Sequence, residues 1–131
     1  LVDVPCSSTG VLRRRPSQRW DLTEKQIHEL PELQIEILAK AASFVSENGG
    51  KLVYSTCSLL REENEDVVRK FEQSSAYREG GFQRWECIPM MESNVNCNDE
   101  VLEKDNPPTF TILPSRRLSD GFFIARWKRG I

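Results

Sequence analysis

Several features that would assign the chain to a common class are absent from its 131 residues. No run approaches the roughly 18–20 consecutive apolar residues that a membrane-spanning helix needs, so the sequence predicts no membrane insertion. Lys and Arg total 18 against 20 Asp and Glu, which gives a formal net charge of −2. This balance excludes binding of nucleic acid through bulk positive charge but allows a local basic patch. The first residues lack the basic segment of a secretory signal, and we expect an intracellular protein.

The cysteines and the histidine also exclude some chemistries. Cys6, Cys57, Cys87 and Cys97 include no pair at the C-x-x-C spacing that is usual in zinc sites, so we predict no metal site. Because nothing in the sequence indicates secretion, we expect free thiols rather than disulfides. The single histidine, His28, falls on a predicted helix surface, away from Cys6 and Cys57, which argues against a cysteine–histidine hydrolase.

The order of the predicted elements indicates an α/β fold. Residues 1–4 and 51–56 are rich in apolar and β-branched side chains and predict two buried strands. A helical pattern lies between these strands, and this order is typical of a parallel pair with a crossover helix. Because the chain opens directly in a buried-looking strand, we expect it to be a fragment whose preceding part is missing.

The segment between the two strands predicts a short helical turn and then a longer helix. Residues 23–26 (Thr-Glu-Lys-Gln) fit a capping box, and Pro31 suits the first position of the next helix. Residues 48–50 (Asn-Gly-Gly) would end that helix. Its wide apolar face would consist of Leu33, Ile35, Ile37, Leu38, Ala41, Ala42, Phe44 and Val45.

The second half of the chain predicts one more helix and three strands. Acidic residues 62–66 would lead the helix, where their charge complements the helix dipole, and Val67, Val68 and Phe71 would face inward. Residues 74–108 are predicted to form a long loop with one short strand near residues 82–88. Strands at residues 109–113 and 122–127 are separated by a short turn, which favours an antiparallel pair.

Two of the cysteines directly follow predicted strands. Cys6 lies two residues after Val4, and Cys57 lies one residue after Thr56. Ligands of open α/β sheets bind beyond the carboxyl ends of the strands, and neighbouring strands are about 4.8 Å apart. We therefore expect both thiols to converge on one pocket, although two small buried cysteines without chemistry fit their residue type equally well. Asp3 lies inside the first strand, where a buried carboxylate needs a partner or a function.

Two further sets of residues leave alternatives open. Arg13, Arg14 and Arg15 form a basic run after the first cysteine, and the run fits either a phosphate contact or a solvated surface. Trp20, Trp85 and Trp127 could stack on bases, but we expect them to pack in the core or at its rim.

The residues around both cysteines resemble the signatures of the RsmB/Nop2/Sun family, which are RNA cytosine-5 methyltransferases that use S-adenosyl-L-methionine (SAM). Residues 3–11 (Asp-Val-Pro-Cys-Ser-Ser-Thr-Gly-Val) resemble the family segment D-x-P-C-S-x-T-G-V, with Ser8 where many members have Gly or Ala. Residues 55–58 (Ser-Thr-Cys-Ser) resemble the second signature. The resemblance also covers residues 33–34, 49–50, 62–65 and 120–126, and it is weak only across residues 74–108.

The resemblance implies that residues 1–131 form one partial domain. This part corresponds to the C-terminal half of a Rossmann-like SAM methyltransferase sheet, strands four to seven, with parallel strands and an antiparallel last pair. The Gly-rich SAM loop, the acidic residue that holds the ribose and a substrate-positioning lysine would all precede residue 1. The SAM site would therefore lie mostly outside this chain.

The resemblance also implies roles for individual residues. Cys57 would be the nucleophile and Cys6 would assist product release, and the presence of both cysteines favours RNA over DNA as the substrate. Asp3 would contact the cytosine or SAM, Pro5 would contact SAM, and residues 13–15 would contact RNA. The partner would be ribosomal or transfer RNA, in the cytoplasm or the nucleolus.

A different class of function is the alternative. The chain would then be a non-catalytic half-domain that binds RNA or a protein partner. In either case its first strand would expose an unpaired edge, and such edges pair with other chains. We therefore expect the isolated chain to dimerise or aggregate.

Overall fold

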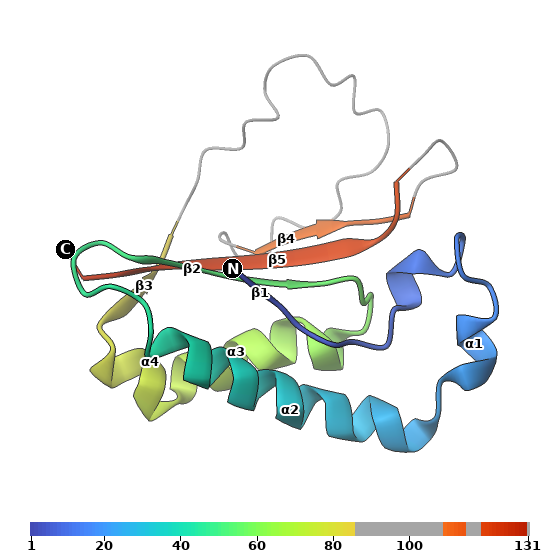
Figure 1. Ribbon diagram of the computed structural model, residues 1–131, viewed down its shortest axis with the longest axis horizontal. Coiled ribbons are helices and arrows are strands. Elements are labelled where there is room, and N and C mark those ends of the chain that lie inside the picture. Colours follow the sequence, from blue (N-terminus) through green and yellow to red (C-terminus); the bar gives the residue numbers. More distant parts are fainter. Residues whose placement is uncertain (86–108, 115–118, 131) are drawn as a thin grey trace, which may run out of the picture.

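The computed structural model describes residues 1–85, 109–114 and 119–130 as a mixed sheet with helices. The strands are β1 (Val2–Asp3), β2 (Lys51–Thr56), β3 (Phe82–Arg84), β4 (Thr109–Ile112) and β5 (Phe122–Arg129). The α-helices are α1 (Gln18–Asp21), α2 (Glu24–Ala42), α3 (Glu65–Gln73) and α4 (Ser75–Glu79), and the 3-10 helices are η1 (Thr9–Val11) and η2 (Arg61–Glu63). Figure 1 shows α2, α3 and α4 on one face of the sheet.

The sheet combines a parallel pair with antiparallel pairs, in the order β1-β2-β5-β3. β1 runs parallel to β2, with Val2 opposite Tyr54, and β5 runs antiparallel to β2 along the whole of β2. The other side of β5 pairs with β4 near its start and with β3 near its end. The predicted α/β class, with an antiparallel last pair, is confirmed, and α2 lies in the crossover between β1 and β2.

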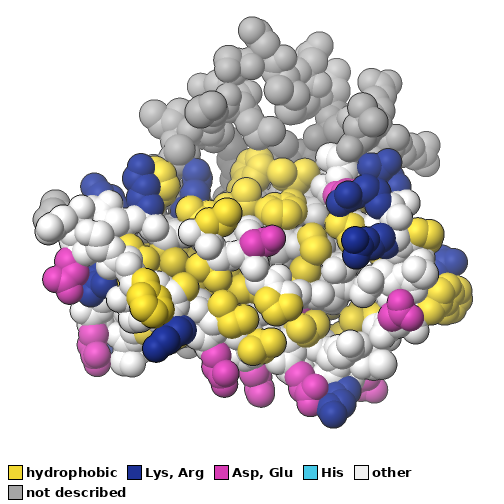
Figure 2. Space-filling model, in the orientation of Figure 1, with side chains coloured by type: hydrophobic (Ala, Val, Ile, Leu, Met, Phe, Trp, Pro, Cys, Tyr) yellow, Lys and Arg dark blue, Asp and Glu magenta, His cyan; other side chains and the backbone are white. Residues whose placement is uncertain are grey.

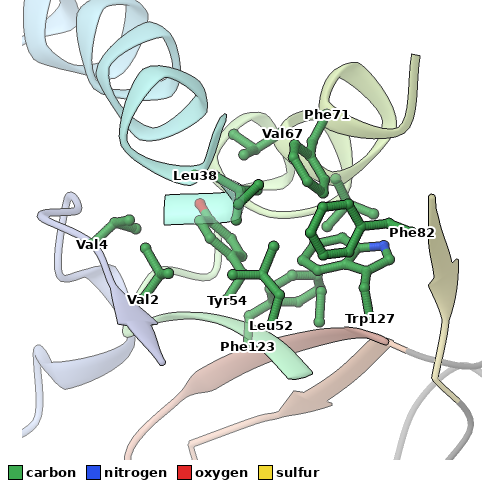
Figure 3. Close-up of a cluster of buried hydrophobic side chains, with 13 residues drawn as sticks. Val2, Val4, Leu38, Leu52, Tyr54, Val67, Phe71, Phe82, Phe123 and Trp127 are labelled. Carbon is green, nitrogen blue, oxygen red and sulfur yellow. The ribbon is translucent and has the colours of Figure 1, made fainter. Parts of the chain in front are cut away.

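The core lies between the sheet and the helices. Alternate side chains of β2 and β5 point toward the helices and are buried, among them Leu52, Tyr54, Phe123 and Trp127. The rest of this cluster consists of Val2, Val4, Leu38, Ala42, Val67, Val68, Phe71, Phe82 and Ala125 (Figure 3). The inward-facing residues predicted on α3 are therefore confirmed.

β1 is buried on one face only. Val2 and Val4 lie in the core, whereas Asp3 between them points to the opposite face and is exposed. The expectation of a carboxylate buried inside an apolar strand is wrong, because the alternation of a strand places Asp3 away from the helices. Among the described residues no strand pairs with the outer edge of β1.

α2 is longer at its start and shorter at its end than the sequence predicts. The capping box of Thr23 and Gln26 is confirmed, but the helix continues through Pro31 instead of restarting there. Pro31 has no N–H, so the helix continues there with one backbone hydrogen bond fewer. The helix ends at Ala42, because Phe44 and Ser43 turn back onto the last carbonyls before the predicted Gly49 is reached. Leu33 and Phe44 of the predicted apolar face are exposed, and Gln34 is buried in their place.

The segment after α3 is more regular than predicted. Its first part forms α4, which the sequence does not predict, and β3, which falls within the short strand predicted near residues 82–88. The remainder, residues 86–108, lies outside the described residues. The acidic residues 62–66 are divided between η2 and the first turn of α3 rather than leading one helix. No helix in the described ranges is long and apolar enough to cross a membrane.

Apolar side chains gather on the surface over α2 and the edge of β1 (Figure 2). A shallow pocket there is lined by Leu1, Val2, Ala41, Phe44 and Val45, among others. Leu1 and Phe44 are mostly exposed, so this part of the helix–sheet seam is left uncovered.

The tryptophans differ sharply in their environments. Trp127 is fully buried against Phe71, and its indole N–H donates to Glu72 at 3.0 Å. Trp85 is half-buried, with the Lys51 ammonium 4.2 Å from the ring centroid. Trp20 is 77% exposed, so the expectation that all three pack in or beside the core is wrong for Trp20.

Trp127 and Trp20 give a matched test of the core. Trp127→Ala removes a fully buried ring and is expected to lower the free energy of unfolding by about 3–5 kcal/mol. Trp20→Ala is expected to change it by less than about 0.5 kcal/mol. Urea unfolding followed by far-ultraviolet circular dichroism measures both, and similar losses in the two variants would contradict the assigned core.

Candidate functional site

The two thiols meet at the edge of the sheet where β1 and β2 end. Cys6 follows β1, Cys57 follows β2, and their sulfur atoms lie 3.0 Å apart, within hydrogen-bonding distance for thiols. Both are free cysteines and are partly buried. The convergence expected from the strand ends is present, because the parallel pairing of β1 and β2 brings both loops to one edge (Figure 1).

The environment of Cys6 favours its protonated form. Burial, together with the hydrogen bond to Cys57, raises the pKa of the Cys6 thiol to about 12. Cys6 therefore keeps its proton at neutral pH and can donate it toward the Cys57 sulfur.

Ser8 stands beside the pair in a strained conformation. Its φ of 60° lies in the left-handed region, which glycine adopts freely and other residues rarely do. Its hydroxyl lies 3.6 Å from the Cys57 sulfur. Many members of the family that the sequence resembles have Gly or Ala at this position, and a glycine adopts this backbone conformation without strain.

A buried carboxylate lies beneath both cysteine loops. Glu63 is 0% exposed and accepts hydrogen bonds from the backbone N–H of Ser7 at 2.9 Å and from its hydroxyl at 2.5 Å. It also accepts from the Ser58 hydroxyl and from the side-chain amide of Gln34, the latter at 2.9 Å. Ser7 follows Cys6 and Ser58 follows Cys57, so one carboxylate is tied to the residue next to each thiol.

Further hydrogen bonds connect the residues around this carboxylate to the core. The Tyr54 hydroxyl donates to the Glu63 carbonyl at 2.6 Å, and the Gln34 amide also donates to the Pro5 carbonyl at 2.9 Å. Burial, with the nearby charge of Glu63, raises the pKa of Tyr54, so the phenol remains a donor. Asn64 accepts from the Thr56 hydroxyl at 2.6 Å and donates to the Ser58 carbonyl at 2.9 Å.

Glycines allow the loops to lie against each other. The Gly10 N–H donates to the Cys57 carbonyl, and the Gly121 N–H donates to the Gly10 carbonyl, both at 2.8 Å. A Cβ at Gly10 would lie 2.5 Å from the Gly121 oxygen and 2.6 Å from the Cys57 oxygen. Only glycine fits there without displacing the backbone that carries Cys57.

Asp3 and Pro5 lie on the approach to Cys6. The Asp3 carboxylate is exposed, and one of its oxygens accepts from the Ser55 hydroxyl at 3.1 Å. Pro5 is exposed, and its carbonyl is occupied by the Gln34 amide. Asp3 therefore has carboxylate surface that a ligand can reach.

The basic run lies after η1 and is partly paired. Arg13 and Arg14 both contact Asp120, Arg13 at 3.7 Å, while Arg15 is exposed. Because Asp120 precedes Gly121, these ion pairs attach the basic run to the glycine contacts of the thiol loops. Part of the positive charge of the run is thus balanced in the folded chain.

The other candidates of the sequence do not join the site. His28 is exposed on α2, in agreement with its predicted surface position. Cys87 and Cys97 lie outside the described residues, and within the described ranges no group of His, Cys, Asp and Glu is arranged to hold a metal ion.

The residues that sequence reasoning missed are the polar ones that organise the loops. Glu63 is predicted as part of an acidic helix start, and although the resemblance includes residues 33–34 and 62–65, it gives neither Gln34 nor Glu63 a role in the site. One signal was available: Gln34 lies three residues after Pro31 and four before Leu38, on the stripe of α2 that is buried. Serine after each cysteine, at positions 7 and 58, was the second signal.

Selective alkylation tests the asymmetry of the thiol pair. Because the raised pKa of Cys6 lowers its thiolate fraction, we expect iodoacetamide at about pH 8 to modify Cys57 several times faster than Cys6. Peptide mass spectrometry at low conversion measures both rates in the same molecule. Equal rates, or faster modification of Cys6, would contradict the assigned protonation.

Comparisons with known proteins bear on the family and the fold of the chain. The family model of the 16S rRNA methyltransferase RsmB/F matches residues 1–128. Ribosomal RNA small subunit methyltransferase B of Escherichia coli O1:K1 / APEC is 37% identical over 128 residues, covering 96% of this chain and 25% of that protein. The crystal structure of PH0851 superposes with a TM-score of 0.73 at 34% identity, covering 95% of this chain and 25% of that one. NSun6 from Pyrococcus horikoshii with SFG gives a TM-score of 0.64 at 27% identity, covering 98% and 29%.

The matches show to which family the chain belongs and how much of its relatives' length the chain covers. Relatives more than 30% identical are matched over nearly the whole chain, which itself spans only 25% of the length of the Escherichia coli protein. With the match of the family model over residues 1–128, this shows that the chain belongs to the family of the 16S rRNA methyltransferase RsmB/F.

Proposed function

We propose that the full-length protein transfers a methyl group from SAM to C5 of a cytosine in RNA, with Cys57 as the nucleophile. The observation that carries this proposal is the thiol pair, with partly buried sulfur atoms 3.0 Å apart at the ends of β1 and β2. The names of the relatives favour ribosomal RNA as the substrate. SFG, an analogue of SAM, is named with the related NSun6 and supports SAM as the methyl donor.

The proposed chemistry needs a sulfur nucleophile because C5 of cytosine reacts poorly by itself. Addition of the Cys57 thiolate to C6 forms an S–C bond and gives C5 the character of an enamine carbon. SAM supplies the electrophilic methyl group that C5 takes up. A base then removes the C5 proton, and the released electron pair restores the ring and expels Cys57 as thiolate. The cytosine must leave its stack to reach the sulfur.

Cys6 is proposed to assist the release of the product. Its proton is retained by burial and by the contact with Cys57, so a hydrogen-bond donor stands 3.0 Å from the sulfur that leaves C6. A donor at this place stabilises the departing thiolate and favours elimination over return to the adduct.

The other residues predicted to contact RNA or SAM are proposed to do so around the thiol pair. Asp3 has an exposed carboxylate that can accept from the cytosine amino group or from SAM, and Pro5 would pack against SAM. Residues 13–15 would contact RNA phosphates, chiefly through Arg15, since Arg13 and Arg14 are paired with Asp120.

The uncovered edge of β1 supports a second candidate, a module that binds RNA or protein without catalysis. β1 pairs on one side only within the described part of the chain, and a shallow apolar pocket lies beside it. Pairing of this edge with another chain would also make the isolated 131-residue chain dimerise or aggregate.

Replacement of the nucleophile is the main test. In the full-length protein, Cys57→Ala is expected to lower the methylation of ribosomal RNA by at least about 10³-fold, because it removes the sulfur that is proposed to form the adduct. Transfer of tritiated methyl from SAM to RNA measures this rate. Circular dichroism must show an intact fold, and an undiminished rate would overturn the assignment of Cys57.

Replacement of Cys6 is expected to have a different effect. Cys6→Ala leaves the nucleophile in place but removes the donor that assists elimination, so the protein–RNA adduct should accumulate. A slowly migrating band on a denaturing gel, absent in the Cys6→Ala/Cys57→Ala double variant, detects the adduct. Failure of the band to appear in a variant that retains its fold would contradict the release role.

A further inference from the structure

We propose that Glu63 is a positioning residue that sets the relative placement of the Cys6 and Cys57 sulfur atoms. The placement of the two sulfur atoms by Glu63 is inferred from geometry alone. The effect of Glu63 on catalysis rests on the proposed function. Glu63 is fully buried and hydrogen-bonds to the residue that follows each cysteine. Glu63 acts through Ser7 and Ser58, and its recorded hydrogen bonds include none to either sulfur.

Full burial makes the carboxylate depend on its partners. A buried carboxylate without hydrogen bonds is strongly destabilising, so the chain must supply donors wherever it buries one. Here one oxygen of Glu63 accepts from the Ser7 N–H and the Gln34 amide, and the other accepts from the two serine hydroxyls. Four donors match a group that, when ionised, only accepts.

The donors come from three separate segments of the chain. Ser7 lies in the loop after β1, Ser58 in the loop after β2, and Gln34 on α2. The two serine hydroxyls also lie 3.0 Å from each other. A single carboxylate therefore joins both thiol loops to one another and to the helix that covers the sheet.

The two serines that hydrogen-bond to Glu63 are each adjacent in sequence to one of the cysteines. Each serine is one residue from its cysteine, so a shift of either serine moves the neighbouring sulfur with it. A misplacement of about 1 Å at a reacting group can reduce a rate about 100-fold. The Gly10–Cys57 backbone bond ties the loops together independently, so loss of the carboxylate should loosen the pair without separating the loops entirely.

Glu63→Gln is the most conservative way to break the arrangement. The amide keeps the shape of the side chain but replaces one acceptor with an N–H₂ group, which faces either the two N–H donors or the two hydroxyls. Glu62→Gln is the matched control, because Glu62 is adjacent in sequence and exposed. Both changes remove one negative charge from the same turn.

The first readout does not depend on catalysis. In the full-length protein, the ratio of Cys57 to Cys6 alkylation by iodoacetamide is expected to fall from several-fold to about one in Glu63→Gln, because Cys6 loses its burial and its contact with Cys57. Glu62→Gln should retain the parent ratio. Labelling well below the melting temperature keeps unfolded molecules from contributing. An unchanged ratio in a folded Glu63→Gln variant would overturn the proposal.

The second readout separates positioning from general stability. For methyl transfer, kcat of Glu63→Gln is expected to fall about 10- to 100-fold, while KM for SAM stays within about twofold of the parent. A parent-like kcat beside an altered labelling ratio would overturn the catalytic part of the proposal. If the parent protein itself transfers no methyl group, the proposed function fails, and the labelling ratio still decides the geometric part.

A second pair of variants covers the case in which Glu63→Gln does not fold. Ser7→Ala and Ser58→Ala each remove one hydroxyl and leave the carboxylate with three donors. Each is expected to lower the labelling ratio about 3-fold, which corresponds to the loss of a single hydrogen bond. Parent-like ratios in both serine variants would overturn the proposal.

Discussion

The buried carboxylate of Glu63 links the core of this chain to its reactive edge. Its backbone carbonyl is held by Tyr54 of the core, and its side chain holds the serines that follow Cys6 and Cys57. A charge at this depth is stable only when all of its donors are in place at once. The thiol loops, η2 and the buried side of α2 are consequently interdependent, and a change in one of them alters the site.

The sheet supplies the other half of the arrangement. Parallel pairing of β1 with β2 brings two distant segments to one edge, and the central β5 fixes β2 from its other side. Because Gly10 and Gly121 carry no side chains, the backbone of Gly10 can hydrogen-bond directly to the backbones of Cys57 and Gly121. Topology places the two cysteines in the same region, and the glycine and carboxylate contacts bring the sulfur atoms to 3.0 Å.

Sequence patterns were most informative where one physical rule acted alone. Strand periodicity predicted β2 residue for residue, and the strand ends predicted the convergence of the thiols. The errors arose where tertiary contacts outweighed local preference: α2 continues through a buried Pro31, and Asp3 is exposed because β1 has one solvent-facing side. The burial of Glu63 was harder to predict, since a glutamate among acidic neighbours is ordinarily solvated. The serine after each cysteine was a signal, but the four donors that make the burial possible come from segments that only the fold brings together.

The surroundings of Cys6 favour its protonated form, and this is the physical basis for the different roles proposed for the two cysteines. Cys6 is desolvated and keeps its proton, and the sulfur of Cys57 lies where that proton can be shared. Because the distinction comes from burial and spacing, it depends on the rigidity of both loops. A pair that moved apart would lose the hydrogen bond and the burial together, and the sulfur atoms would become two similar thiols. The same polar cluster that stabilises the fold at this edge therefore also maintains the chemical difference between them.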